Sequence, residues 1–234
     1  MTKRKRRQRP DRMPIRVRER ADGRTALEVD GVVQSILVKL DDGTPAGTAG
    51  REIGYWAAMV PPDMAIAPRR ALLLGLGGGT VAHLLAHRYP GIEIVGIESD
   101  ARVLTVARRD LGLETVPGLV VTQTDAFAWA AKAAEREPGT YDYIGLDLYL
   151  AGRLVAGTLA RDFLRQVAAL LEPNGLLAVN LMVTAHTSDH LLRLQRVFWL
   201  ERTIHVRGNT VAHLRRADDL PPGNTPATPA EDHW

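Results

Sequence analysis

The sequence predicts an α/β fold, a doubly wound and mostly parallel sheet that follows a small N-terminal β-hairpin element. From residue 71 onward, apolar runs of strand length alternate with segments of helical periodicity, which is typical of a parallel sheet with helices on both faces. The first apolar run leads directly into a glycine-rich turn at residues 75–79. Before these elements, the pair Asp30-Gly31 separates two apolar runs and thereby predicts the hairpin.

The predicted elements have recognisable starts and stops. Asp100 is the expected N-cap of a helix that Gly112 ends, and Pro173-Asn174-Gly175 closes a later helix. The last two strands are joined at Gly208-Asn209 as a hairpin that ends the sheet. In chain order, we expect β structure at 25–40, a loop at 41–50, helix 53–59, a strand ending at 74, helix 83–89, strand 92–98, helix 101–111, strand 119–122, helix 126–137, strand 141–148, helix 161–171, strand 176–182, helix 188–197, and strands 199–207 and 210–215.

Composition limits the classes of protein to consider. The 234 residues contain no cysteine, which excludes a disulfide framework, a thiolate nucleophile and a cysteine metal site. No apolar run approaches the about 20 residues needed to span a bilayer, and the basic N-terminus lacks the hydrophobic core of a secretory signal. We therefore expect a cytoplasmic protein with no membrane partner. The pattern His186-x-x-Asp189-His190 fits a solvated helix start better than a ligand set, so no metal is expected.

Charge is distributed unevenly along the chain. Residues 1–20 contain ten Lys or Arg and two acidic residues, a balance of +8, whereas the rest of the chain has 20 basic and 25 acidic residues, a balance of −5. Such a basic arm could contact nucleic acid. No aromatic side chain interleaves these charges, however, so a disordered, solubilising leader is the favoured interpretation.

The glycine-rich turn and the acidic strand end after it predict a nucleoside pocket. Gly75, Gly77 and Gly78 let the backbone approach a ligand with no Cβ in the way. Glu98, at the tip of the next strand, can accept both hydroxyls of a ribose. Thr80 replaces the third glycine of a dinucleotide fingerprint, which counts against NAD and favours a sulfonium nucleoside such as S-adenosylmethionine. A tight strand-to-helix connection without a ligand is the alternative.

Acidic residues also end the two following strands. Asp125 and Asp147 come after strands that should end at the same edge of the sheet as Glu98, and ligands of doubly wound sheets bind at this edge. Asp125 can equally serve as the N-cap of the next helix. Tyr149 can stack on a substrate or simply close the pocket. Together with the glycine turn, the three acids predict one shared site.

With these features in order, residues 27–217 resemble the spermidine synthase-like branch of proteins with the class I methyltransferase, Rossmann-like fold. The hairpin is the most specific feature, because plain methyltransferases lack it. The resemblance is carried by Leu-Glu-Val-Asp-Gly-Val-Val-Gln-Ser (27–35), Gly-Leu-Gly-Gly-Gly-Thr (75–80), Val-Gly-Ile-Glu-Ser-Asp (95–100), Thr-Asp-Ala-Phe (124–127), Tyr-Asp-Tyr-Ile-Gly-Leu-Asp (141–147), Arg-Asp-Phe-Leu (161–164) and Gly-Asn-Thr-Val (208–211).

The resemblance implies roles for individual residues. Gln34 would lie over the nucleoside, and Glu98 would bind the ribose hydroxyls. Asp125 would accept the adenine amino group, and the backbone amide of Ala126 would contact the ring. Asp147 would deprotonate the attacking amine, which must lose its proton before its lone pair can attack the carbon beside a sulfonium.

The chain departs from the family pattern at several positions. Thr80 stands where the family has an acid that holds the donor's propylamine, and Leu150 replaces a second acid three positions beyond the catalytic one. Tyr55-Trp56-Ala57 replaces a Tyr-His-Glu-like stretch on a gating segment. Two missing carboxylates weaken a site for polycationic substrates. The change at Thr80 also makes ordinary S-adenosylmethionine easier to accept.

The resulting prediction is a transferase of polyamine biosynthesis that moves an aminopropyl group from decarboxylated S-adenosylmethionine to a small amine, without a metal. The alternatives are an S-adenosylmethionine-dependent methyltransferase and a non-catalytic nucleoside- or nucleic-acid-binding protein. The resemblance also implies a homodimer. We expect a basic, disordered arm at 1–24, a hairpin and gating segment at 25–65, a nucleoside-binding α/β domain at 66–217 and a disordered tail at 218–234. The predicted catalytic residues are Asp147 and Tyr149, and the predicted donor-binding residues are Gln34, Gly75, Gly77, Gly78, Glu98, Asp125 and Ala126.

Overall fold

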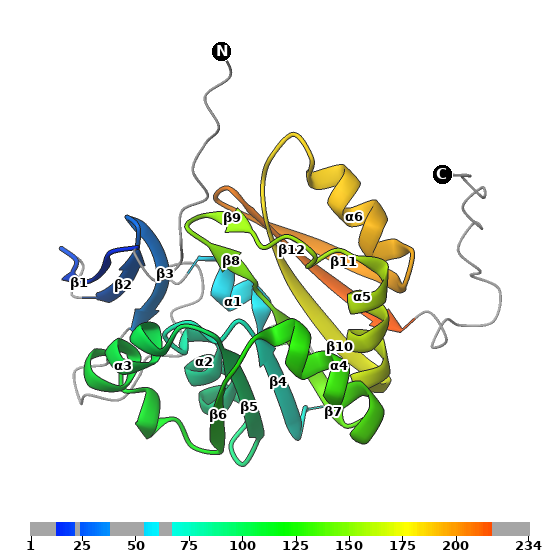
Figure 1. Ribbon diagram of the computed structural model, residues 1–234, viewed down its shortest axis with the longest axis horizontal. Helices are drawn as coiled ribbons and strands as arrows, with labels where there is room; N and C mark the ends of the chain where they lie inside the picture. Colours follow the sequence, from blue (N-terminus) through cyan, green and yellow to red (C-terminus); the bar gives the residue numbers. More distant parts are fainter. Residues whose placement is uncertain (1–12, 22–23, 38–53, 61–66, 217–234) are drawn as a thin grey trace.

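A seven-stranded sheet forms the centre of the molecule (Figure 1). The computed structural model describes residues 13–21, 24–37, 54–60 and 67–216. The sheet has the order β11-β12-β10-β7-β4-β5-β6, and only the pairs that involve β12 are antiparallel. The predicted α/β fold with a mostly parallel sheet is therefore confirmed. Its strands are β4 (Arg70–Leu74), β5 (Glu93–Glu98), β6 (Leu119–Gln123), β7 (Tyr141–Leu146), β10 (Leu171–Met182), β11 (Phe198–Val206) and β12 (Asn209–Arg216).

Helices cover both faces of this sheet, because its central strands are apolar on both sides. In β4, Leu73 packs with α1, α2 and α3, whereas Leu72 and Leu74 pack with α4, α5 and α6 on the opposite face. Asp100 caps α3 by accepting a hydrogen bond from the backbone N–H of Arg102, as the sequence predicts. The helices are α1 (Tyr55–Met59), α2 (Thr80–Arg88), α3 (Ala101–Asp110), α4 (Ala126–Arg136), α5 (Arg161–Leu170) and α6 (Thr187–Gln195), with a short 3₁₀ helix at Leu113–Thr115.

The strand order places a crevice at the end of the sheet's central pair. The chain runs from β4 to β5 and β6 on one side, and then crosses back to β7 on the other side of β4. Strands β4 and β7 are neighbours, but the loop after β4 leads to α2 on one face of the sheet, whereas the chain after β7 leads to α5 on the other face. Ligands of such sheets bind in the crevice formed at this reversal of strand order.

A separate three-stranded antiparallel sheet precedes this domain. It consists of β1 (Ile15–Glu19), β2 (Thr25–Val29) and β3 (Val32–Leu37), and its β2–β3 turn has positive φ angles at Asp30 and Gly31. The predicted hairpin is thus present. Strand β1 lies inside the segment expected to be a disordered arm. The high basic charge there masked an Ile15-x-Val17 alternation, and Ile15 packs against an apolar cluster that includes Leu27 and Val29.

Two further differences concern the end of β7 and the start of β10. Strand β7 ends at Leu146 rather than at residue 148, and it is followed by a small hairpin of β8 (Tyr149–Leu150) and β9 (Arg153–Leu154). These strands are too short to produce a periodic pattern. Strand β10 begins at Leu171 and continues through an irregularity at the Pro-Asn-Gly segment, which does not separate helix from strand as expected.

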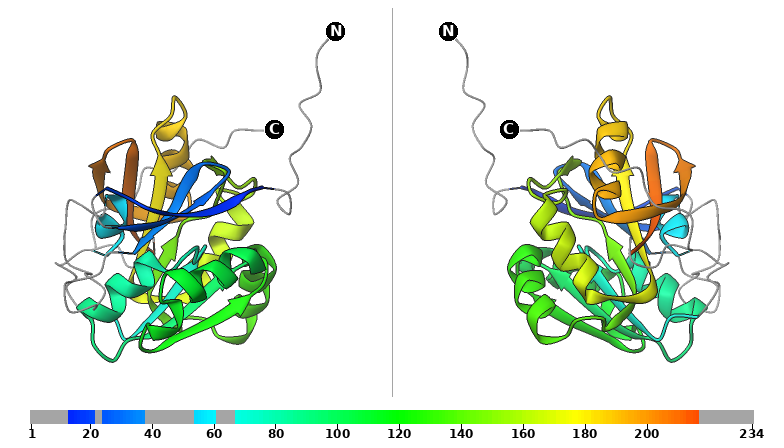
Figure 2. Two further views of the ribbon diagram at one scale, coloured as in Figure 1. Left: turned by 90° about the vertical axis from the view of Figure 1, so that its left-hand side faces the viewer. Right: turned by 90° about the vertical axis from the view of Figure 1, so that its right-hand side faces the viewer.

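The β8–β9 hairpin of the main domain packs against the N-terminal sheet. Its turn residues Ala151 and Gly152 have positive φ angles, and a Cβ at Gly152 would lie 3.5 Å from a methyl group of Val32. The side views place both elements at the same end of the molecule (Figure 2). Within the described ranges, no helix is long and apolar enough to cross a membrane.

Candidate active site

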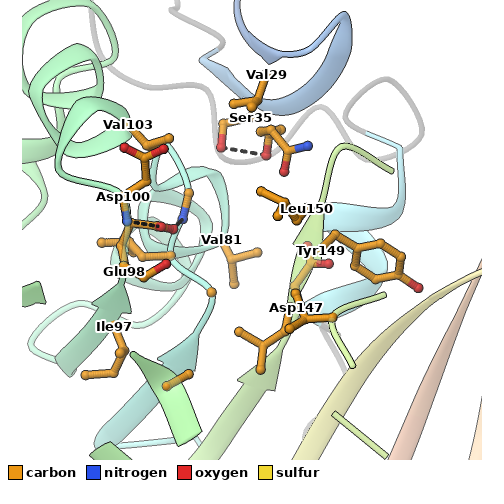
Figure 3. A pocket seen from close by; sticks show the side chains of 18 of the residues that line it. Val29, Ser35, Val81, Ile97, Glu98, Asp100, Val103, Asp147, Tyr149 and Leu150 are labelled. Atoms are coloured by element: carbon orange, nitrogen blue, oxygen red, sulfur yellow. Dashed lines mark hydrogen bonds between the residues drawn. The ribbon is translucent and has the colours of Figure 1, made fainter. Parts of the chain in front are cut away.

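A cavity of about 260 Å³ lies where the carboxyl ends of β4, β5, β6 and β7 meet the N-terminal sheet (Figure 3). It is the crevice that the strand order creates. Eight of the nine predicted site residues line it, and Gly78 does not. The lining residues are Val29, Gln34, Ser35, Trp56, Gly75, Leu76, Gly77, Thr80, Val81, Ile97, Glu98, Ser99, Asp100, Val103, Thr124, Asp125, Ala126, Phe127, Asp147, Leu148, Tyr149, Leu150, Ala151 and Val155.

The glycine turn allows the loops after β4 and β7 to approach closely. Gly75 has a φ of 91°, and a Cβ there would lie 2.3 Å from the carbonyl oxygen of Asp147. Only glycine fits this position. Gly78 has a structural role. Its N–H donates a hydrogen bond to Ser35 Oγ at 2.6 Å, and its Cα packs against β3. It anchors the turn to the N-terminal sheet.

Glu98 is fixed by the backbone. Its Oε2 accepts a hydrogen bond from the N–H of Gly77, and its Oε1 accepts one from the N–H of Asp100, both at 2.9 Å. Burial raises the pKa of Glu98, and these backbone N–H groups oppose the shift. Because each carboxylate oxygen can accept a second hydrogen bond, Glu98 can still receive two hydroxyl groups.

Asp125 and Ala126 lie at the start of α4. Asp125 Oδ1 accepts a hydrogen bond from the N–H of Ala128 at 2.9 Å, so the N-cap interpretation is confirmed. Both residues also line the cavity. The N-cap hydrogen bond orients the Asp125 carboxylate at the edge of the cavity and involves only Oδ1, so Oδ2 does not take part in it.

Asp147 follows β7 and is held by side chains from two distant elements. Its Oδ2 accepts a hydrogen bond from the hydroxyl of Tyr55 at 3.0 Å, and its Oδ1 accepts one from Nδ2 of Asn180 at 2.8 Å. Burial raises the pKa of Asp147 to about 6, against the lowering effect of both hydrogen bonds. A carboxylate with a pKa near neutrality is well suited to exchange protons with a substrate.

Three residues of this network were not among the predicted site residues. Asn180, in β10, is 2% exposed, and its Oδ1 accepts a hydrogen bond from Nδ2 of Asn209 in β12 at 2.8 Å. Tyr55 lies in α1, and burial raises the pKa of its phenol far above the ordinary value, so it stays protonated as a donor. The sequence signals were Asn180, a polar residue inside the apolar run 176–182, and the places of Tyr55 in the gating stretch and of Asn209 in the stretch 208–211, but none of these related the three residues to Asp147.

The side chain of Tyr149 extends away from the cavity toward the end of β10 (Figure 3). Its hydroxyl accepts a hydrogen bond from the N–H of Met182 at 2.8 Å. Burial raises the pKa of Tyr149 to about 12, so the phenol is neutral at physiological pH. Of the two roles considered, this geometry favours closing the pocket over stacking on a substrate.

The two positions that lack the acid of the family pattern carry no charge into the cavity. Thr80 Oγ1 donates to the carbonyl of Ile36 at 3.0 Å and accepts from the N–H of the same residue at 2.9 Å. This pair ties α2 to β3. Leu150 packs against the apolar cluster beneath the N-terminal sheet. The described lining thus has four carboxylates and no Lys, Arg or His, an electrostatic setting that attracts cations.

The His-x-x-Asp-His segment does not gather into a ligand set. Nδ1 of His186 lies 3.8 Å from Oδ2 of Asp189, and both side chains are largely exposed. Among the residues that the structure describes, no group of three or more His, Cys, Asp or Glu side chains is arranged to hold a metal.

Comparison with known sequences identifies relatives that are transferases. The chain is 31% identical over 123 residues to a polyamine aminopropyltransferase from Vibrio vulnificus and 35% identical over 135 residues to one from Mycobacterium tuberculosis. These matches cover 53% and 55% of this chain but only 41% and 25% of the relatives. A trans-aconitate 2-methyltransferase from Paracidovorax citrulli is 31% identical over 117 residues, covering 50% of this chain and 40% of that protein. No protein-family model matches the chain.

Solved structures share the fold over most of the chain. A probable spermidine synthase from Corynebacterium glutamicum aligns with a TM-score of 0.68 and 19% identity, covering 88% of this chain and 77% of that one. Human methyltransferase-like protein 13 in complex with SAH aligns with a TM-score of 0.59 and 25% identity, covering 74% and 82%. The resemblance to spermidine synthase-like proteins and to the class I methyltransferase fold is confirmed.

Proposed function

We propose that this protein is a transferase that moves an alkyl group from a sulfonium nucleoside to a small amine. The preferred reaction is aminopropyl transfer from decarboxylated S-adenosylmethionine, the chemistry of polyamine biosynthesis. The observation that carries the proposal is the partly buried carboxylate of Asp147, held by Tyr55 and Asn180 in a cavity that also contains Glu98. The aminopropyltransferase relatives support the same reaction class.

In this proposal, the nucleoside occupies the side of the cavity formed by β5 and β6. Glu98 accepts the two ribose hydroxyls while the N–H groups of Gly77 and Asp100 keep its carboxylate in place. Asp125 and Ala126 face the base, and Gln34 covers the nucleoside from the N-terminal sheet. The nucleoside-binding domain from residue 66 and the hairpin element before it thus contribute to one site.

The reaction is a direct displacement. Asp147 takes a proton from the acceptor ammonium, and the freed lone pair attacks the carbon attached to the sulfonium. The new C–N bond forms as the C–S bond breaks. The electron pair of the C–S bond stays on sulfur and gives a neutral thioether nucleoside. Orientation of the two substrates and the charge of Asp147 supply most of the rate.

Methyl transfer is the second candidate, and one observation favours it. The uncharged Thr80 hydroxyl is hydrogen-bonded to both backbone groups of Ile36, so this position supplies no carboxylate to pair with a donor ammonium. A donor that keeps its carboxylate also meets no acidic group there. The trans-aconitate 2-methyltransferase relative is consistent with this alternative.

Donor binding and product analysis separate these candidates. Titration calorimetry with both donors in one preparation is expected to give tighter binding of the decarboxylated form, and mass spectrometry of an amine acceptor is expected to show an added aminopropyl group. Preference for S-adenosylmethionine with an added methyl group would establish the second candidate. Binding of neither donor would refute the proposed function.

The non-catalytic alternative depends on the basic N-terminus. Residues 1–12 lie outside the described residues, so nucleic-acid contact through the arm remains a prediction, as do cytoplasmic localisation and a homodimer. Removal of residues 1–12 separates the two classes of function, because the transferase should keep its turnover whereas a nucleic-acid-binding protein should lose its salt-sensitive binding.

A further inference from the structure

The cavity has two chemically different sides. Glu98 and Asp100 lie on one side, and Asp147, Tyr149 and Leu150 lie on the other (Figure 3). The first side also receives Asp125, so it carries three of the four carboxylates among the described lining residues. The proposed nucleoside occupies that side. The acceptor is therefore left with the side on which Asp147 is the single carboxylate among the residues that the structure describes.

Apolar side chains form part of the cavity wall on the acceptor side. Trp56 lies next to Tyr55, which donates to Asp147, and Trp56 is 6% exposed. Val81 lies between the two sides, and Leu150 closes the acceptor side from β8 (Figure 3). An alkyl or aromatic group placed here would exchange water for contact with these side chains, which is favourable.

The hydroxyl groups around the cavity already make hydrogen bonds. That of Tyr55 donates to Asp147, that of Tyr149 accepts from the N–H of Met182, and that of Thr80 is engaged with Ile36. None of them carries a charge. A second ammonium group on the acceptor would therefore lose its hydration without gaining a counterion from the described lining, which is costly.

We propose that the acceptor is a primary monoamine with an alkyl or arylalkyl body, rather than a diamine or polyamine. Its one amino group meets Asp147, and its apolar body lies against Trp56, Val81 and Leu150. This inference rests on the proposed function in requiring an amine as the acceptor. It does not depend on whether an aminopropyl or a methyl group is transferred.

A matched pair of amines tests the inference directly. n-Hexylamine and 1,6-diaminohexane have the same chain length and differ by one terminal ammonium. With the full chain saturated by 5′-methylthioadenosine, or by S-adenosylhomocysteine if that product binds, calorimetry is expected to show at least about tenfold tighter binding of n-hexylamine. Equal or tighter binding of the diamine, or binding of neither amine, would overturn the inference.

Turnover distinguishes failure of this inference from failure of the proposed function. If n-hexylamine binds selectively but neither donor alkylates it, the inference that this side binds a monoamine is supported and the proposed function fails. If both amines are alkylated with equal kcat/KM, the proposed function stands and the inference fails. Each result is read from the same preparation.

Position 150 offers a gain-of-function test with matched controls. In Leu150→Asp, the new carboxylate is expected to reverse the preference, so that 1,6-diaminohexane binds more tightly than n-hexylamine. Leu150→Asn, which is similar in size but uncharged, should keep the preference for n-hexylamine. Leu192→Asp makes the same change on α6, where Leu192 is 60% exposed and outside the cavity, and should leave both affinities unchanged. A folded Leu150→Asp variant with unchanged preference would contradict the proposed position of the acceptor.

Discussion

The two sides of the cavity hold their principal carboxylates by different means. Glu98 is fixed by backbone N–H groups of the adjacent glycine turn and of its own loop, 21 and 2 residues away. Asp147 is fixed by side chains of Tyr55 and Asn180, 92 and 33 residues away. The first arrangement depends on the backbone shape of the glycine turn and of the loop after β5. The second depends on the packing of three elements, so single substitutions should affect it more.

The largest expected effect tests the chemical role of the second arrangement. Asp147→Asn should lower kcat about 10²- to 10⁴-fold, because an amide cannot take the proton of the attacking amine. Donor affinity measured by calorimetry should change little. Turnover within a few-fold of the unchanged protein would contradict the assigned role.

The stability of the same variant provides its control. The folded-state pKa of Asp147 is raised to about 6, so the folded protein binds this proton more tightly than the unfolded chain does. The stability that this protonation contributes is present at low pH and is lost as the pH rises through about 6. At pH 8, Asp147→Asn should therefore unfold at a temperature no lower than that of the unchanged protein, which thermal denaturation would measure.

The next largest effect concerns the backbone-held side. Glu98→Gln should weaken donor binding about 10- to 100-fold, because hydrogen bonds to a charged acceptor are replaced by weaker ones and one oxygen becomes a donor group. The kcat at saturating donor should fall much less than in Asp147→Asn. Glu93→Gln, at the opposite end of β5, is the matched control and should bind the donor normally. Loss of binding in both variants would indicate a general defect of the strand.

The same contrast explains which parts could be predicted from the sequence. Glu98 and the N-cap residues Asp100 and Asp125 belong to short motifs, whose geometry follows from the adjacent residues. The Asp147 position was predicted, but its partners Asn180 and Tyr55 were not, because no local pattern relates residues so far apart. The β8–β9 hairpin and β1 were missed for another reason, since two-residue strands and charge-rich strands give weak periodic signals.

A smaller effect should follow when the positioning of Asp147 is loosened without removing its carboxylate. The hydrogen bond from Asn180 lowers the pKa of Asp147, so Asn180→Ala should move the acid limb of the kcat/KM profile to higher pH. At pH 8, where Asp147 is ionised in either case, kcat should fall only about tenfold. Asn209→Ala, which acts through Asn180, should cause the same shift to a lesser extent. An acid limb that does not move would mean that the amides serve packing alone.

The smallest expected effect separates closing the pocket from catalysis at Tyr149. Its hydroxyl accepts a hydrogen bond from the N–H of Met182, so Tyr149→Phe removes one link between β8 and β10 and leaves the ring in place. The free energy of unfolding should fall by about 1 kcal/mol, while kcat/KM changes less than about threefold. A hydroxyl that takes part in proton transfer would instead cost about 100-fold or more in kcat. Chemical denaturation and steady-state kinetics on one preparation distinguish the two roles. A large loss of kcat at unchanged stability would show that Tyr149 takes part in catalysis and does not only form the wall of the pocket.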